Sequence, residues 1–158
     1  MARTIITQNG HIVQGLPPVA DAFAGTVRSD VINVKNHRQC TFIIQKGVGT
    51  TGTSTVTVNA CDDTTPTTRS TIPFKYRACT SSDTWGAVTT AVAAGFDTTA
   101  GSNHLYEIIV DCDELGDLGY GFVELNLVEV VDSPVLAGIL VILQEPRSAQ
   151  NIPATALS

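Results

Sequence analysis

The sequence predicts an all-β fold, an antiparallel β-sandwich resembling a jelly roll, formed by one domain over residues 31–146. Two observations predict it. Short segments of alternating apolar and polar residues, separated by turn-forming residues, suggest roughly six to eight strands and no helix longer than one turn. Of the 158 residues, 43% are hydrophobic and only 15% are charged. Threonine and serine are concentrated in the middle of the chain, and branched side chains suit a pleated sheet.

The first strands are predicted shortly after residue 31. Residues 40–45 form a short apolar run, residues 46–52 are rich in glycine, and residues 54–60 alternate strictly. Valine and alanine occupy one side of this last segment, and threonine and asparagine occupy the other. This order predicts a β-hairpin with one face on a core and the other in water.

The middle of the chain predicts further strands of the same kind. Residues 72–78 and residues 106–110 both alternate, and residues 85–92 are a weaker candidate. Between them and the last strands, residues 113–119 (DELGDLG) are too short and too rich in glycine for more than a single helical turn.

The last two predicted strands differ in pattern. Residues 123–127 alternate, whereas residues 136–143 are an apolar run without alternation. A run of that kind predicts a strand covered on both faces, either within the sandwich or at a subunit contact. After it, residues 147–158 are expected to form a polar C-terminal tail.

Residues 1–30 are predicted to form an extended N-terminal arm, because glycine and proline interrupt any periodicity there. The segment is more apolar than disordered tails usually are. We therefore expect the arm to contact a partner surface, with folding back onto its own domain as the alternative. The residues expected to make such contacts are Ile5, Ile12, Leu16, Val19 and Phe23 in the arm and Arg147 in the tail.

Charge and hydropathy exclude several classes of partner. The formal net charge is −6, and the few basic residues are scattered along the chain, so no basic face is expected for nucleic acid. The longest apolar run, residues 136–143, falls far short of the roughly 20 residues that span a bilayer. The N-terminal residues do not resemble a signal peptide, because no sufficiently long apolar stretch follows Arg3. We therefore expect synthesis in the cytosol and no membrane partner.

The cysteines predict structural thiols. Cys40, Cys61, Cys79 and Cys112 are far apart in the sequence, without a C-x-x-C pair or a histidine at zinc-ligand spacing. Cys40 and Cys112 share strand parity with apolar neighbours. Because a cytosolic protein keeps its thiols reduced, buried thiols are favoured over disulfides.

No complete catalytic or cofactor motif is present, so we expect neither an enzyme nor a cofactor. His11, His37 and His104 have unrelated surroundings, and no nucleophile motif accompanies them. Residues 111–116 (DCDELG) imitate the start of a calcium loop, but the later ligand positions hold leucine and phenylalanine. The glycines of residues 47–52 fit a dinucleotide motif in spacing only, because no helix follows them.

Two alternatives would give the sandwich a ligand. A hydrolase would need paired carboxylates, such as Asp111 and Glu124, held in one cleft. A carbohydrate-binding or adhesive module would need exposed aromatic rings. Trp85 and Tyr120 are the candidates, because the other tyrosines fall on the apolar side of their strands.

Several short segments occur in a characteristic order: residues 61–66 (CDDTTP), 72–77 (IPFKYR), 83–86 (DTWG), 106–108 (YEI), 113–115 (DEL) and the stretch 134–146. Together they resemble a known family of small β-sandwich proteins, those encoded beside the major capsid gene of tailed bacteriophages and prophages. The resemblance covers roughly residues 40–147.

The resemblance implies a decoration (cement) protein that binds the outer surface of the phage head and stabilises it. The major capsid protein would be its partner, and the protein itself would form a homotrimer. The family has no catalytic residues, which agrees with the motif search. A phage tail or connector protein is the nearest alternative, since it would share the fold class and the lack of catalysis.

Overall fold

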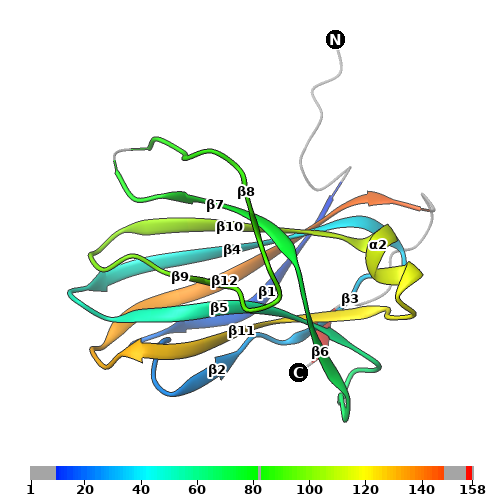
Figure 1. Ribbon diagram of the computed structural model, residues 1–158, viewed down its shortest axis with the longest axis horizontal. Coiled ribbons are helices and arrows are strands. Elements are labelled where there is room, and N and C mark those ends of the chain that lie inside the picture. Colours follow the sequence, from blue (N-terminus) through cyan, green and yellow to red (C-terminus); the bar gives the residue numbers. More distant parts are fainter. Residues whose placement is uncertain (1–9, 82, 148–155, 158) are drawn as a thin grey trace.

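The alternating segments form two antiparallel sheets that pack face to face (Figure 1). The computed structural model describes residues 10–81, 83–147 and 156–157. The first sheet, sheet A, contains in spatial order β1 (Gly10–Val19), β12 (Val135–Pro146), β4 (His37–Gly49), β10 (His104–Asp111), β7 (Phe74–Cys79) and β8 (Thr89–Ala91).

The second sheet, sheet B, lies across the core from sheet A. In spatial order it contains β13 (Ala156–Leu157), β3 (Val31–Asn33), β11 (Phe122–Val131), β5 (Thr53–Cys61) and β6 (Arg69–Ile72), with β2 (Thr26–Arg28) paired to β11 and β9 (Phe96–Asp97) paired to β5. A single short helix, α2 (Cys112–Asp117), is the only one in the described residues. The all-β sandwich is confirmed, whereas the helix, with six residues, is longer than the single turn predicted.

The connectivity is that of a jelly roll. The principal strands in chain order are β1, the pair β2 and β3, β4, β5, β6, β10, β11 and β12. Numbered one to eight in this order, β1, β12, β4 and β10 of sheet A are strands 1, 8, 3 and 6. In sheet B, the pair β2 and β3 is strand 2, and β11, β5 and β6 are strands 7, 4 and 5. Consecutive strands therefore lie mostly in opposite sheets.

This connectivity corrects the predicted hairpin over residues 40–60. β4 and β5 belong to different sheets, and the chain crosses the sandwich between them. Gly52 lies in this crossing so close to the backbone of Ser133 that a Cβ atom would overlap the Ser133 carbonyl oxygen. The two connections β4–β5 and β11–β12 thus pack together at one end of the sandwich. Alternation predicts which face of a strand is buried, but it does not predict the sheet to which the strand belongs.

Two more strand predictions need correction. The segment 72–78 is split at Pro73, which lacks an N–H for a continuous ladder; β6 pairs in sheet B and β7 in sheet A. In the segment 85–92, only the residues of β8 form a strand.

The predicted arm is wrong for residues 10–28, which belong to the sandwich. β1 pairs along β12, with Ile12 opposite Ile142, and β2 pairs with β11. Phe23 is completely buried in the core between them. Register shifts around Pro17 and Pro18 interrupt the alternation of β1 and hide the strand in the sequence. Residues 1–9 lie outside the described residues.

The C-terminal tail is likewise not entirely separate from the domain. β13 adds to the edge of sheet B by pairing with β3, with Ala156 opposite Ile32. Arg147 is exposed, and residues 148–155 and Ser158 lie outside the described residues.

The core is filled by the inward side chains of both sheets, and its buried lysine has partners. Lys46 lies there, and its ammonium group donates hydrogen bonds to the carbonyl oxygens of Gly52 (3.0 Å) and Thr99 (2.8 Å). It also lies 5.5 Å from the centre of the Phe23 ring. Burial lowers the pKa of Lys46. The side chain therefore fastens two loops to β4 from inside the sandwich.

All four cysteines lie in the described part of the chain, and all are buried and free of disulfides, as predicted. Burial raises the pKa of Cys61 and of Cys112 to about 12. Such thiols stay protonated at neutral pH and are poor nucleophiles. No helix of the described chain has the length and apolar character needed to cross a membrane.

Candidate interaction surface

The outer face of sheet A carries several aliphatic side chains among polar ones. Successive side chains of a strand point to opposite faces, and on β12 the residues Val135, Ala137, Ile139, Val141 and Leu143 fill the core. Their neighbours therefore point outward. Together with the outward residues of β1, β4 and β10 they form what we call the aliphatic face: Ile12, Ile43, Leu105, Ile109, Leu136, Leu140 and Ile142.

Strand register pairs some of these side chains directly, whereas Leu105 and Ile109 lie opposite the polar residues Gln45 and Thr41 of β4. Ile12 lies opposite Ile142, and Leu140 lies opposite Ile43. The four strands β1, β12, β4 and β10 are adjacent in sheet A (Figure 1). Leu136, Leu140 and Ile12 are 42%, 44% and 44% exposed, so the domain itself leaves them uncovered.

Charged side chains border the aliphatic face toward β7. Arg77 forms an ion pair with Glu107 of β10, and its guanidinium group lies 4.7 Å from the centre of the Trp85 ring. At the α2 end a groove of about 340 Å³ opens on the same face. The groove is lined by apolar and by oppositely charged residues, among them Arg38, Phe74, Lys75, Ile109, Asp111 and Glu114.

The outer face of sheet B is polar by comparison. Glu124 is buried there, and its carboxylate oxygen Oε1 accepts hydrogen bonds from Asn59 Nδ2 (2.9 Å) and Arg69 Nε (2.8 Å). Arg28 Nε lies 3.5 Å from the same oxygen. This face thus pairs its buried carboxylate, whereas the outer face of sheet A leaves aliphatic surface in water.

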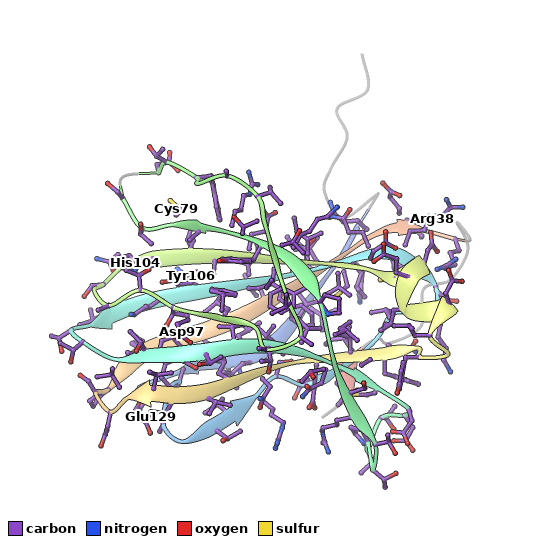
Figure 2. The ribbon with its side chains drawn as sticks, viewed as in Figure 1. Arg38, Cys79, Asp97, His104, Tyr106 and Glu129 are labelled. Carbon is purple, nitrogen blue, oxygen red and sulfur yellow. The ribbon has the colours of Figure 1, made fainter. Side chains whose placement is uncertain are left out.

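The residues considered for catalysis are not brought together. His37 begins β4, whereas His104 lies opposite Lys46 near the other end, about 30 Å away at ~3.3 Å per residue. Figure 2 shows His104 beside Tyr106, and their side chains are 3.5 Å apart. Asp111 and Glu124 belong to different sheets.

The calcium-like segment has a structural use instead. The Asp111 carboxylate caps α2 by accepting hydrogen bonds from the backbone N–H groups of Asp113 (2.9 Å) and Glu114 (3.2 Å). No cluster of three or more His, Cys, Asp or Glu side chains suited to a metal occurs in the part of the chain that the structure describes.

The two candidate aromatic residues do not form a sugar platform. Trp85, in the β7–β8 loop, already has the Arg77 guanidinium group over its ring. Tyr120 follows α2 and packs against the core. In Figure 1 the β7–β8 loop and α2 lie at opposite ends of the sheets.

The predicted contact residues that the structure describes lie in four different environments. Ile12 lies on the aliphatic face, whereas Leu16 and Val19 are half-buried against the core. Phe23 is wrong as a contact residue, because its side chain is completely buried. Arg147 is exposed and pairs with the Asp113 carboxylate. Ile5 lies outside the described residues.

The aliphatic face was predicted only in part, through Ile12 and the run 136–143. Leu136, Leu140 and Ile142 had a signal, because the run 136–143 lacks alternation and predicts a strand with two covered faces. The fold covers only the inner face of this strand, β12. Ile43 also lies in a short apolar run, over residues 40–45, whereas the segment of Ile109 was predicted only from its alternation.

Acidification is expected to destabilise the domain through His37. Both ring nitrogens of His37 are buried without a hydrogen-bond partner among the described residues. Burial lowers the pKa of His37 below its ordinary value near 6.5, and the nearby His11 lowers it further. His37 therefore binds a proton more readily in the unfolded chain than in the folded domain. As the pH drops below about 6.5, the free energy of unfolding decreases, by at most ~1.4 kcal/mol per pH unit for one proton.

Urea unfolding at pH 7.5, 6.5 and 5.5 measures this effect. We expect His37→Leu to have a smaller loss of stability over this range than the unmodified protein. His104 contributes to the remaining slope, because burial also lowers its pKa. An identical slope in both proteins would contradict the assignment to His37.

Comparisons with known proteins leave the family open. No family model matches the sequence, and no curated protein matches it. The chain is similar to a solved structure, the crystal structure of the SPBc2 prophage-derived protein YomS, with a TM-score of 0.45 and 15% sequence identity. The match covers 89% of this chain and 98% of that chain. Function therefore has to be inferred from the residues of this chain.

Proposed function

We propose that this chain is a structural protein of a tailed-phage virion, a decoration protein that binds the outer surface of the capsid. The observation that carries the proposal is the aliphatic face. A sheet of an independent domain normally presents polar side chains to water on its outer side, and a contiguous exposed apolar patch marks an interaction site. The sequence resemblance described above supplies the partner, the major capsid protein.

The polar groups of the domain support a role without chemistry. The buried charged groups Lys46 and Glu124 are engaged with backbone carbonyl oxygens or with neighbouring side chains. Their partners hold loops and strands together. A domain of this kind offers a partner a surface, and its contribution to an assembly is binding.

The size of the aliphatic face suits a contact that is repeated many times. Four strands ~4.8 Å apart and a rise of ~20 Å from Leu136 to Ile142 give a footprint of about 400 Å². A stable protein interface buries roughly 800 Å² on each partner. A single contact would thus be weak, but many copies on a repetitive shell reinforce one another.

The test is sedimentation with capsids that lack the protein. We expect saturable binding at hundreds of copies per particle for the unmodified chain. Leu140→Lys should weaken binding at least tenfold, because an ammonium group would have to lose its water in an apolar contact. Val128→Lys is the matched control, since Val128 is 38% exposed in β11 of sheet B.

Two results would contradict the proposal. Equal binding by the Leu140→Lys and Val128→Lys variants would show that the aliphatic face is not the contact. Saturation at a dozen copies or fewer would favour a connector or tail protein instead.

A further inference from the structure

β1 is the edge strand at one end of sheet A. Its only strand partner among the described residues is β12. Exposed edges are normally protected by charged side chains, proline or bulges. The second half of β1 has such protection, with Pro17, Pro18 and two register shifts, and the Gly15 carbonyl oxygen accepts a hydrogen bond from Asp30 N (2.7 Å). Residues 10–14 (GHIVQ) contain neither a charge nor a proline.

We propose that residues 10–14 pair antiparallel with the same residues of a second copy of this chain, with Ile12 on the twofold axis. The pairing would join two copies of sheet A into one continuous sheet. It is an isologous contact, in which the same edge is used by both copies. The pairing itself needs no capsid, but its use in docking rests on the proposed function.

The residues that would meet in this pairing carry no formal charge, and this favours a second copy as the occupant. With Ile12 opposite Ile12, Gly10 lies opposite Gln14, and His11 lies opposite Val13. Antiparallel pairing keeps residues of one face together, so each Ile12 stays on the aliphatic face. Each copy has a net charge of −6, yet no charged side chain of one copy meets a like charge along residues 10–14.

Pairing would also enlarge the docking surface. The two Ile12 side chains would connect the aliphatic faces of both copies without covering them. The combined footprint would be about 800 Å², which is the size that one partner contributes to a stable interface. A twofold dimer would therefore present a docking surface large enough for a stable interface, which the face of a single copy does not.

Cysteine cross-linking tests the pairing directly. Opposite residues in an antiparallel pair have Cα atoms ~4.5–5.5 Å apart, within disulfide range. Ile12→Cys should therefore give a disulfide-linked dimer under mild oxidation, with little interference from the four buried natural cysteines. Leu140→Cys is the matched control, with the same 44% exposure as Ile12. In the proposed dimer its two copies are three strand spacings (~14 Å) apart across the sheet and four residues (~13 Å) apart along it, too far for a disulfide.

Light scattering on the variants separates this inference from the proposed function. The unmodified chain should be dimeric, Ile12→Lys should weaken the dimer at least tenfold, and Leu140→Lys should remain dimeric while losing capsid binding. Cross-linking of Leu140→Cys without Ile12→Cys would overturn the edge pairing in favour of face-to-face packing. A monomer, or the trimer that the family resemblance implies, would overturn it as well. A dimer that fails to bind capsids would contradict only the proposed function.

Discussion

Replacing Phe23 with alanine is expected to lower the free energy of unfolding by about 3–5 kcal/mol. Its side chain is completely buried in the core and lies beside the buried ammonium group of Lys46. The substitution would therefore leave a cavity and remove the cation–ring contact. Since domains are stable by only about 5–15 kcal/mol, this is a large share of the total, and urea unfolding measures it.

Ile12→Ala is the control for this measurement. Ile12 belongs to the same N-terminal segment but is 44% exposed on the aliphatic face. We expect a loss of less than about 1 kcal/mol. If Phe23→Ala lost no more stability than Ile12→Ala, Phe23 would not be a core residue, and the extended arm predicted from the sequence would be favoured again.

The buried face of most strands could be predicted from the sequence. Alternation assigned Val56 and Val58 of β5, and Ile108 of β10, to the core, and all three are completely buried. The reason is physical, because a strand with one wet face must place its apolar residues at every second position. The same rule identified the all-β class.

The partners of each strand could not be predicted in this way. The pattern of a strand is the same whichever sheet it joins, so alternation alone predicts a hairpin where the chain crosses from β4 to β5. β1 was missed because its pairing with β12 shifts register around Pro17 and Pro18. A shift of that kind removes the period of two from the sequence while the strand itself continues.

The candidate surface was only partly predictable for the same reason. An outward Ile43 or Ile109 is unremarkable within one strand, since single exposed apolar residues are common. The surface depends on strand register, which places Ile43 opposite Leu140 of β12, whereas Thr41 of β4 lies between Ile109 and Ile142. The run 136–143 indicated that both faces of β12 would be covered, and the structure identifies the face that still needs a partner.

Gly95→Ala is expected to lower the free energy of unfolding by about 2–4 kcal/mol, because two costs combine at this position. Gly95 has a positive φ of 82°, which disfavours a residue with a Cβ atom. A Cβ atom would also overlap the carbonyl oxygen of Val56 in β5, and overpacking of this kind costs about 1–3 kcal/mol. The next residue, Phe96, stacks on Tyr76 at 3.9 Å between ring centres, so a shift of this loop would disturb the core.

Two further glycines separate these costs. Gly119 has a φ of 85°, but a Cβ atom there would meet no other atom within 4 Å, so Gly119→Ala should cost only about 1 kcal/mol. Gly116 lies in α2 with equally open surroundings and no positive φ, so Gly116→Ala should be neutral or stabilising by up to ~1 kcal/mol. Thermal or urea unfolding should rank the losses in the order Gly95, Gly119, Gly116. Equal losses at Gly95 and Gly119 would mean that the approach to Val56 is not tight and that backbone conformation alone constrains the loop.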